Sequence, residues 1–373
     1  MAIRRGFRRN KVNIIQTKLD NVNYLKRQYN FKGLYHFTDF SNLKNILETG
    51  YLYSRNDTIN KFENFRDGAD PDIIGKLNTF GRGNIKNCVR FYYRPRVSTL
   101  YVNEGVKLKQ YCQNTHIPMP VYLLFDENLV YSQNIVYSDG NATSKYTHFG
   151  NSDEFFINMD WRLIFSDGPY SNYIDYSDTI QNLELKRKRQ AELLSIVPVS
   201  IEEYLKKIIF RCPADMQRAI NVLGSNDKYE INSELFSDKN DVNDDRYKNN
   251  YIEKYDYFIF KKHFHMKMFF KYNLIYPNKF DIKADIIYSN NKAKTIEFCE
   301  KDYFKNKKIV TTNEGKKIYK KNDFGKDIIA ISINSNIVDL IIEGTNIKKV
   351  QVYINNFLYI EEYYNNENEI RRI

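Results

Sequence analysis

One acidic residue lies inside an apolar run near the middle of the chain. Glu192 falls within Ala191–Val197, which is predicted to be a strand because its other residues are almost all apolar. A carboxylate in such a strand either points to solvent or lines a cleft in which it has a chemical role. Glu192 is therefore the first candidate for a catalytic carboxylate.

A second candidate site lies at a predicted strand-to-helix junction. Within Phe31–Arg55 the pattern predicts a strand at Leu34–Phe37 and then an amphipathic helix that ends at Gly50. His36 and Thr38 lie where side chains and free backbone N–H groups point into the same space, a suitable place to bind a nucleotide. The same residues could equally form an ordinary buried strand end.

An aromatic strand with a basic end follows at Cys88–Tyr101. The ladder is expected to end near Pro95, which lacks a backbone N–H, and Arg94 and Arg96 flank that proline. Aromatic rings beside guanidinium groups can stack on a planar ring and bind an anion together. The alternative is an edge strand with an exposed turn.

Two further segments combine positive charge with aromatic residues or with the acidic strand. Thr143–Phe149 mixes basic and aromatic side chains, a combination that binds single-stranded nucleic acid. Lys186–Arg189 is a dense basic patch directly before the acidic strand. A long predicted loop, Asn56–Lys86, contains Arg66 and Arg82, which could reach a pyrophosphate or a nucleic-acid backbone.

The overall composition favours a polyanionic partner. The net charge is +11 and the pI is about 9.1, with 31 Tyr and 25 Phe, so nucleic acid is the first candidate and an anionic membrane surface the second. The four cysteines are scattered, which indicates neither a zinc site nor a disulfide framework and fits a reducing cytosol. No apolar run approaches membrane-spanning length, so we expect a soluble, cytoplasmic protein without a membrane partner.

The chain is predicted to contain two domains. The boundaries are a basic N-terminal arm and leading helix at 1–30, a first domain at 31–225, a polar linker at 226–250 and a mostly-β accessory domain at 251–373. His263 and His265 alternate on one predicted strand, but without a third ligand nearby they predict no metal site.

The ordered motifs resemble the DarT family of toxins, DNA ADP-ribosyltransferases within the ADP-ribosyltransferase superfamily. The resemblance runs from Phe31 to about Arg211 through LYHFTDFSNLKNIL, RFYYRPRVSTLY, VYSDGNATSKYTHF, DW and KRKRQAELL. It implies an α+β fold with a split β-sheet core and flanking helices, to which the smaller, mostly-β C-terminal domain is added.

The resemblance also implies roles for individual residues. Glu192 is similar to the catalytic glutamate and Arg66 to the family's catalytic loop arginine, for which Arg82 is the alternative. NAD would contact His36, Thr38, Asn42, Tyr92 and Tyr93. The nucleic-acid substrate would contact Arg96, Lys145, Tyr146, His148, Arg187 and Arg189.

The implied activity is transfer of ADP-ribose from NAD, consumed as a substrate, to a base in single-stranded nucleic acid. No metal is required, DNA is favoured over RNA, and the expected context is a toxin–antitoxin or phage-defence system with an antitoxin protein as partner. Val97-Ser98-Thr99 replaces the family's Ser-Pro-Met, which leaves the base open. The alternatives are modification of RNA bases, modification of a protein, and a non-catalytic nucleic-acid-binding module.

Overall fold

The computed structural model describes most of the N-terminal two thirds of the chain and the strands of the C-terminal third. The described residues are 17–57, 85–105, 117–167, 179–236, 252–260, 263–270, 281–298, 309–311, 317–319, 328–334, 337–343 and 346–363. Arg66 and Arg82 lie outside them, as does the basic arm before residue 17.

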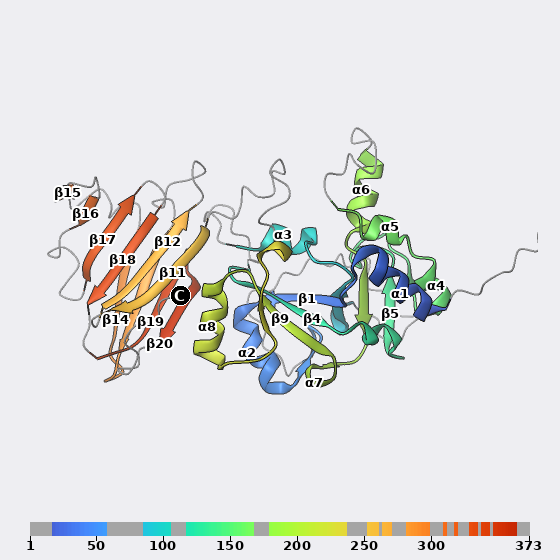
Figure 1. Cartoon of the computed structure of the whole chain (residues 1–373), viewed down its shortest axis with the longest axis horizontal. Coiled ribbons are helices and arrows are strands. Elements are labelled where there is room, and N and C mark those ends of the chain that lie inside the picture. The colour runs from blue at the N-terminus through green and yellow to red at the C-terminus, as the bar shows by residue number, and fades with distance from the viewer. Residues whose placement is uncertain are drawn as a thin grey trace, which may run out of the picture.

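An eight-stranded mixed sheet forms the core of the N-terminal part (Figure 1). Its strand order is β10–β9–β4–β1–β3–β7–β5–β6, and the β9–β10 pair is parallel. The strands are β1 (Leu34–Asp39), β3 (Val89–Tyr92), β4 (Pro120–Phe125), β5 (Ile135–Ser138), β6 (Phe149–Gly150), β7 (Glu192–Ser195), β9 (Leu205–Phe210) and β10 (Tyr229–Ile231). A separate short pair joins β2 (Tyr51–Leu52) to β8 (Val199–Ser200).

The large sheet is nearly divided between β1 and β3. β1 pairs with β4 along its full length, from Leu34 opposite Phe125 to Asp39 opposite Pro120. With β3 it shares one residue pair, Tyr35 opposite Tyr92. The sheet therefore splits into the halves β10–β9–β4–β1 and β3–β7–β5–β6, which confirms the predicted split-sheet α+β fold.

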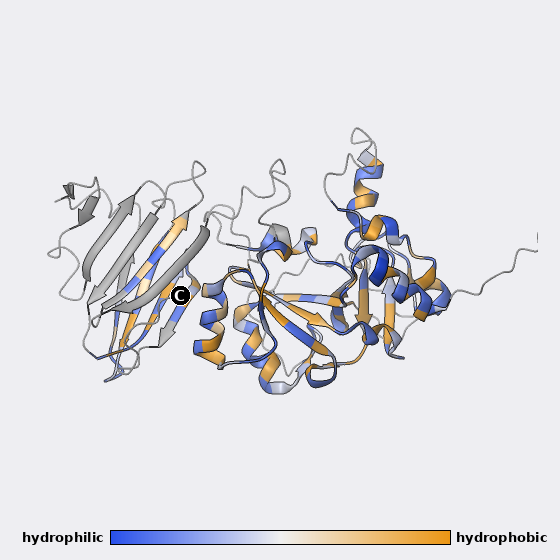
Figure 2. Cartoon of the chain, viewed as in Figure 1, coloured by the Kyte–Doolittle hydropathy of each residue, from blue (hydrophilic) through white to orange (hydrophobic). Residues whose placement is uncertain are grey.

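Helices cover this sheet and connect its strands. They are α1 (Lys18–Tyr29), α2 (Phe40–Thr49), α3 (Ser98–Asn103), α4 (Asp153–Ile157), α5 (Trp161–Ile164), α6 (Thr179–Lys188), α7 (Ile201–Tyr204) and α8 (Pro213–Leu223), with short 3₁₀ helices at Ile85–Asn87, Glu127–Tyr131 and Ser233–Leu235. The central strands are largely hydrophobic (Figure 2), and the buried core includes Trp161, as its size suggests.

The two ends of α2 follow directly from its sequence. The Asp39 carboxylate accepts a hydrogen bond from the Ser41 backbone N–H at 3.0 Å, which caps the N-terminus of the helix. Gly50 ends the helix with a φ of 71°, a conformation that glycine adopts without a steric penalty. Between these two ends, Leu43 and Ile46 are buried. This helix carries Asn42 next to Thr38.

The C-terminal part is β-rich, as predicted. One sheet has the order β11–β12–β18–β17–β16–β15 and the other β14–β13–β19–β20. The strands are β11 (Ile252–Phe260), β12 (His263–Phe270), β13 (Ile282–Tyr288), β14 (Ala293–Phe298), β15 (Ile309–Thr311), β16 (Lys317–Tyr319), β17 (Ile328–Asn334), β18 (Ile337–Glu343), β19 (Ile347–Ile354) and β20 (Phe357–Tyr363). Met266, Ile286 and Val352 are among their buried side chains.

The segment predicted as a linker begins with ordered structure. β10 pairs with β9 from Tyr229 opposite Ile208 to Ile231 opposite Phe210 and so extends the first sheet, and the 3₁₀ helix Ser233–Leu235 follows it. Residues 237–251 lie outside the described residues, and the domain boundary there remains a prediction. No helix in the described part of the chain is long and apolar enough to cross a membrane.

Candidate active site

Glu192 is a fully buried carboxylate held by two neighbouring elements. It opens β7, opposite Tyr92 of β3, and its side chain has no exposed surface. Arg90 donates from Nε to Oε2 at 2.5 Å and from Nη2 to Oε1 at 2.7 Å, and the Ala142 backbone N–H donates to Oε1 at 2.9 Å. This bidentate arrangement fixes the carboxylate plane and compensates its burial. Among the described residues, Oε2 accepts a hydrogen bond only from Arg90 Nε.

Arg90 itself was missed in the sequence analysis. Burial opposes its charge, but the adjacent Glu192 carboxylate outweighs that effect and raises the pKa of the guanidinium above its ordinary value. Its side chain keeps about a third of its surface exposed, at 30%. Arg90 is thus a permanent cation whose inner face holds Glu192.

His36 lies against the same strand. Its Nδ1 is 2.9 Å from the Arg90 carbonyl oxygen, and its ring meets the Phe91 ring edge-on. Burial lowers the pKa of His36 to about 4, so the imidazole is neutral at pH 7. Because a carbonyl oxygen only accepts hydrogen bonds, Nδ1 carries the proton, which leaves Nε2 as an acceptor for a ligand hydroxyl.

Thr38 and Asn42 form a buried polar pair where β1 meets α2. The Asn42 Nδ2 donates to Thr38 Oγ1 at 3.0 Å, and both residues are less than one tenth exposed. Thr38 is near the end of β1 and Asn42 is in the first turn of α2, where backbone N–H groups and the helix dipole favour an anion. His36, Thr38 and Asn42 are thereby assembled beside the split in the sheet.

The two tyrosines of the second motif have different surroundings. Tyr92 stacks on Phe37 with 5.6 Å between ring centroids and an angle of 10° between the rings. Its residue pairing with Glu192 places it on the side of the sheet where the carboxylate lies. Tyr93 packs edge-on against Trp161 at 5.0 Å within the hydrophobic core. A contact between Tyr93 and NAD remains a prediction.

Gln190 is a second residue near the site that the sequence analysis did not select. Thr99 Oγ1 donates to Gln190 Oε1 at 2.7 Å, and the Gln190 side-chain amide donates to the Lys186 carbonyl oxygen at 3.1 Å. Gln190 is only 5% exposed. Thr99 belongs to the segment Val97-Ser98-Thr99, which differs from the family motif. Its side chain therefore contacts a residue two positions before Glu192.

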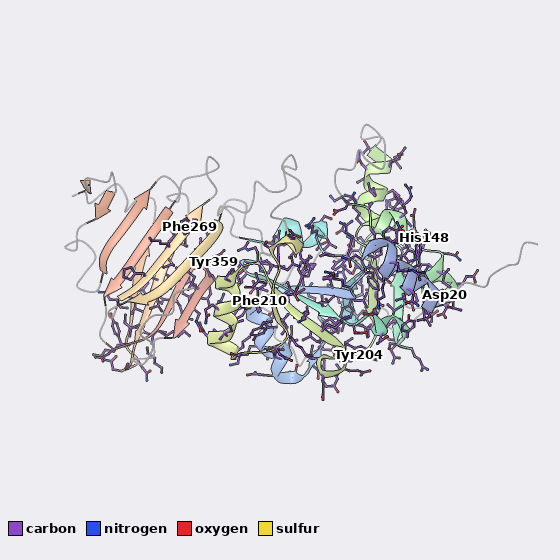
Figure 3. All side chains as sticks on the ribbon, viewed as in Figure 1. Asp20, His148, Tyr204, Phe210, Phe269 and Tyr359 are labelled. Atoms are coloured by element: carbon purple, nitrogen blue, oxygen red, sulfur yellow. The ribbon has the colours of Figure 1, made fainter. Side chains whose placement is uncertain are left out.

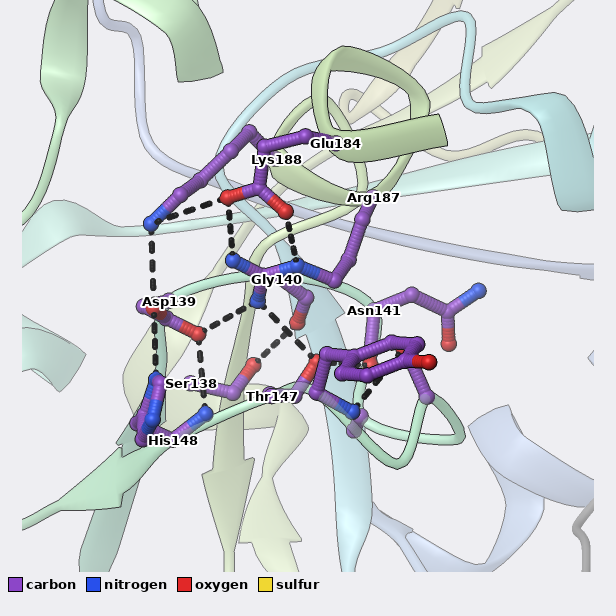
Figure 4. Close-up of polar contacts among 12 residues, drawn as sticks. Ser138, Asp139, Gly140, Asn141, Thr147, His148, Glu184, Arg187 and Lys188 are labelled. Carbon is purple, nitrogen blue, oxygen red and sulfur yellow. Dashed lines mark hydrogen bonds and ion pairs between the residues drawn. The ribbon is translucent and has the colours of Figure 1, made fainter. Parts of the chain in front are cut away.

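The loop between β5 and β6 is tied to α6 by an ion-pair network (Figure 4). Arg187 Nη1 binds Asp139 at 2.7 Å and its Nη2 binds Glu184 at 2.6 Å, while Lys188 Nζ binds Asp139 at 3.0 Å. Burial would raise the pKa of Asp139, but hydrogen bonds from Arg187, the His148 backbone and Lys188 hold it well below its ordinary value. Arg187 is 8% exposed. Its contact with nucleic acid remains a prediction.

Gly140 makes this network possible. A Cβ at that position would lie 2.8 Å from Arg187 Cγ and 2.5 Å from its Nη1. Only glycine lets the arginine cross the loop at this distance. The same loop continues into Ala142, whose backbone N–H donates to Glu192, so the network positions a contact of the Glu192 carboxylate.

The outer part of the loop is exposed. Lys145 Nζ lies 5.0 Å from the centroid of the Tyr146 ring, and Tyr146 is 66% exposed. His148 is also exposed, with Nδ1 3.2 Å from Asp139 Oδ2. An aromatic face beside a cation, both open to solvent, is the arrangement that stacks an unpaired base near its phosphate.

Basic side chains also converge on the segment after α5. Arg96 Nη1 lies 3.7 Å from Asp167 Oδ2, and Arg189 Nε donates to Ser166 Oγ at 2.8 Å. Arg96 has a φ of 59° and donates its backbone N–H to the Tyr122 hydroxyl. Arg94 Nη1 donates to the Ser166 carbonyl oxygen and Nη2 pairs with Asp167. Arg96, which follows β3, and Arg189, which precedes β7, therefore reach one surface from neighbouring strands of the same half of the sheet.

A metal centre has no counterpart in this geometry. Among the described residues, no group of three or more His, Cys, Asp or Glu side chains is arranged to hold a metal ion.

Comparison with protein families identifies the N-terminal part. A family model described as "ssDNA thymidine ADP-ribosyltransferase, DarT" matches residues 35–237, more than half of the chain. The chain belongs to the DarT family. This confirms the resemblance found in the sequence motifs and makes the chain an NAD-dependent ADP-ribosyltransferase by family. The DarT match extends past α8 and β10, beyond the limit at Arg211 expected from the motifs.

Solved DarT structures are similar to about half of the chain. Thermus sp. 2.9 DarT in complex with NAD⁺ is 21% identical, with a TM-score of 0.42, and the match covers 54% of this chain and 96% of that one. Thermus sp. 2.9 DarT in complex with ADP-ribosylated ssDNA is 20% identical, with a TM-score of 0.41, and the match covers 55% of this chain and 96% of that one. Thermosipho africanus DarTG in complex with ADP-ribose is 20% identical, with a TM-score of 0.38, and the match covers 55% of this chain and 51% of that one. Among curated proteins, none matches the chain.

Proposed function

We propose that this chain transfers ADP-ribose from NAD to a base of single-stranded DNA, with Glu192 as the catalytic carboxylate. The observation that carries the proposal is the fixed, fully buried Glu192 carboxylate one strand away from the split in the sheet, within a chain of the DarT family. A carboxylate held in this way needs little reorganisation during a reaction.

NAD would bind along the split, between β1 and β3. The neutral His36 would accept a hydrogen bond from a ribose hydroxyl at Nε2, as its Nδ1 proton is directed to the Arg90 carbonyl. The first turn of α2, with Thr38 and Asn42, would face the negatively charged part of the dinucleotide. Tyr92, stacked on Phe37, would border the nicotinamide side.

The transfer exchanges one C–N bond for another. The bond from the ribose C1′ to nicotinamide breaks and its electron pair leaves with nicotinamide, so positive charge develops on the ribose. The negative charge of Glu192 stabilises that charge. A base nitrogen then forms the new bond to C1′, and Glu192 accepts the proton which that nitrogen loses. Arg66, or alternatively Arg82, is proposed as the loop arginine that assists this step.

The acceptor strand would lie along the exposed basic surface. Lys145, Tyr146 and His148 lie on one loop, and Arg96 and Arg189 lie near Ser166 and Asp167. Phosphate contacts and stacking of this kind do not require base pairing. Thymine is the first base to test, because thymidine is the acceptor named in the description of the matching family.

A toxin role follows from such an activity. An enzyme that modifies DNA bases would harm the cell that contains it unless a partner restrained it, so we propose a toxin–antitoxin or phage-defence context. RNA is the second candidate acceptor, because backbone contacts and stacking do not by themselves distinguish it from DNA.

The proposal is tested by comparing how much label the chain transfers to different acceptors under the same conditions. The purified chain is incubated with labelled NAD and single-stranded DNA, single-stranded RNA, duplex DNA or a protein mixture. Label on single-stranded DNA, lost when thymine is omitted from the strand, supports the proposal with thymidine as acceptor. Label confined to RNA or to protein would refute the assigned acceptor.

A further inference from the structure

The C-terminal β-rich region is packed against one helix of the transferase part. α8 lies between the large sheet and the strands β20 and β11 (Figure 1). Figure 3 marks Tyr359 of β20 at the end of the β-rich region that adjoins this helix. Tyr359 is 1% exposed, and Arg211 and Arg218 are each 4% exposed. Two buried guanidinium groups therefore lie in this interface, where each needs internal partners.

Both arginines are joined to the same residue of β20. Arg211 Nη2 donates to the Tyr359 hydroxyl at 3.0 Å, and Arg218 Nη1 donates to the Tyr359 carbonyl oxygen at 3.3 Å. Arg211 also lies 3.8 Å from the carboxylate of Asp215, on the first turn of α8. Docking of β20 thus supplies hydrogen-bond acceptors to side chains that water does not reach.

Arg218 connects this interface to the start of α2. Its guanidinium carbon lies 4.3 Å from the centroid of the Phe40 ring, and its Nη1 is 3.0 Å from the Met119 Sδ. Phe40 is the first residue of α2. A planar guanidinium over an aromatic ring fixes both groups when they are buried.

Phe40 and Met119, which Arg218 contacts, are hydrogen-bonded to each other, and Met119 is hydrogen-bonded to Asp39 next to the proposed NAD site. The Phe40 N–H donates to the Met119 carbonyl at 3.0 Å, and the Met119 N–H donates to the Asp39 carboxylate at 3.3 Å. Asp39 follows Thr38 directly and caps the helix that carries Asn42. Burial raises the pKa of Asp39, and the charge of Arg218 acts in the opposite direction. The path from β20 to the Thr38–Asn42 pair is therefore continuous.

We propose that docking of β20 on α8 positions the start of α2 for NAD, with Arg218 as the positioning residue. If β20 were displaced, Arg218 would lose an acceptor at Tyr359 and its buried position over Phe40 would become unfavourable. The cap of α2 would then loosen. By thermodynamic reciprocity, NAD must strengthen docking of β20 to the same extent that docking strengthens NAD binding. This inference depends on the proposed function, because it assumes that NAD binds at α2.

Hydrogen exchange measures the reciprocal effect. The full chain carrying Glu192→Gln, which should bind NAD without turning it over, is compared with and without NAD. We expect slower amide exchange both in β1–α2 and in β20. Protection of β1–α2 without protection of β20 would overturn this inference and leave the proposed function intact. Failure of NAD to protect either segment would refute NAD binding at α2, on which both depend.

A substitution tests Arg218 directly in the otherwise unchanged full chain. Arg218→Met should raise the KM for NAD roughly fivefold or more, the lower end of typical coupling between sites, with kcat nearly unchanged. The matched control is Lys44→Met, which removes a cation from the exposed face of α2, where Lys44 is 63% exposed; its KM should stay at the wild-type value. Arg218→Lys should restore KM only partly, because lysine lacks the planar group. A lower melting temperature with KM unchanged would reduce Arg218 to a structural role and overturn the inference.

Discussion

At the scale of single residues, the site depends on protonation states that the fold imposes. Arg90 is held cationic beside Glu192, and His36 is held neutral between Arg90 and Phe91. The Arg90 cation fixes the Glu192 carboxylate, and the neutral His36 imidazole offers the lone pair of its Nε2 to a ligand. Each state has a measurable consequence.

The pKa of His36 is the first of these. Burial lowers it to about 4 from the ordinary value near 6.5. Between those values an unfolded chain binds a proton that the folded chain does not, so stability should fall as pH decreases through this window and be unaffected by His36 above it. NMR titration of the imidazole should give a midpoint near pH 4 with the proton on Nδ1. A midpoint near the ordinary value would contradict the described environment.

Arg90 should matter for the rate more than for folding. Arg90→Met removes both side-chain donors to Glu192, and because Arg90 is partly exposed we expect a stability loss of about 1–3 kcal/mol. Transfer activity should fall at least about tenfold, because the Glu192 carboxylate loses the two donors that fix its plane. Activity equal to that of the wild type would show that Arg90 does not serve Glu192.

The sequence predicts Glu192 but not Arg90, for a physical reason. An acid in an apolar strand is conspicuous because burial of its charge is costly. An arginine in the short aromatic strand VRFYY has an ordinary alternative, which is to point to solvent. Its role depends on the pairing of β3 with β7, which places Tyr92 opposite Glu192. That register is a tertiary property and cannot be obtained from local spacing.

At the scale of elements, the loop between β5 and β6 has an internal anchor and an exposed tip. Arg187, Asp139 and Glu184 tie the loop to α6, while Lys145 and Tyr146 face solvent. The family resemblance placed both Arg187 and Lys145 among the residues expected to contact nucleic acid. Their separation depends on which ones meet a carboxylate after folding.

Two substitutions should separate anchor from tip. Arg187→Met should lower the free energy of unfolding by about 1–3 kcal/mol, because it leaves Asp139 and Glu184 without their main partner. Lys145→Met should leave the melting temperature unchanged and reduce the salt dependence of single-stranded DNA binding by about 0.7 in the log–log slope. Lys292→Met, at an exposed turn of the β-rich region, is the control for lost charge. An unchanged slope for Lys145→Met would exclude a phosphate contact.

Helix and strand limits were more accessible to prediction than these contacts. Asp39 and Gly50 delimit α2, and Ser200 caps α7 by accepting from the Glu203 N–H, because capping is a local property. The short strand β10 was missed, since Tyr229–Ile231 lies in a polar context and is held by its parallel pairing with β9. Long-range pairing overrides weak local preference in such segments.

At the scale of the whole molecule, a DarT-type transferase is joined to a β-rich region. The two sheets of that region have their own buried apolar residues, including Met266, Ile286 and Val352. Composition indicated this division, but the contact of β20 with α8 could not be predicted, because it joins residues far apart in the sequence. The buried Arg211, just before α8, and Arg218, within it, acquire these partners only in the folded molecule.

The β-rich region is predicted to fold by itself. Residues 251–373, produced alone, should give a dispersed amide spectrum and protected amides in β12, β13 and β19, because the core of that region is internal to it. Removing the contact with α8 would uncover Tyr359 and should loosen β20 most. A fragment without exchange protection would contradict the domain boundary at residue 251.

We propose that transfer of ADP-ribose to single-stranded DNA depends on the Glu192 carboxylate. The most direct measurement is mass spectrometry of a thymine-containing single strand after incubation with NAD and either the wild-type chain or Glu192→Gln, a variant of nearly the same shape without the charge. We predict that the wild-type chain adds ADP-ribose to the strand, and that Glu192→Gln slows the transfer at least about a hundredfold while still binding NAD. Equal transfer by both proteins would contradict a catalytic role for Glu192, and an unmodified strand with the wild-type chain would contradict single-stranded DNA as the acceptor.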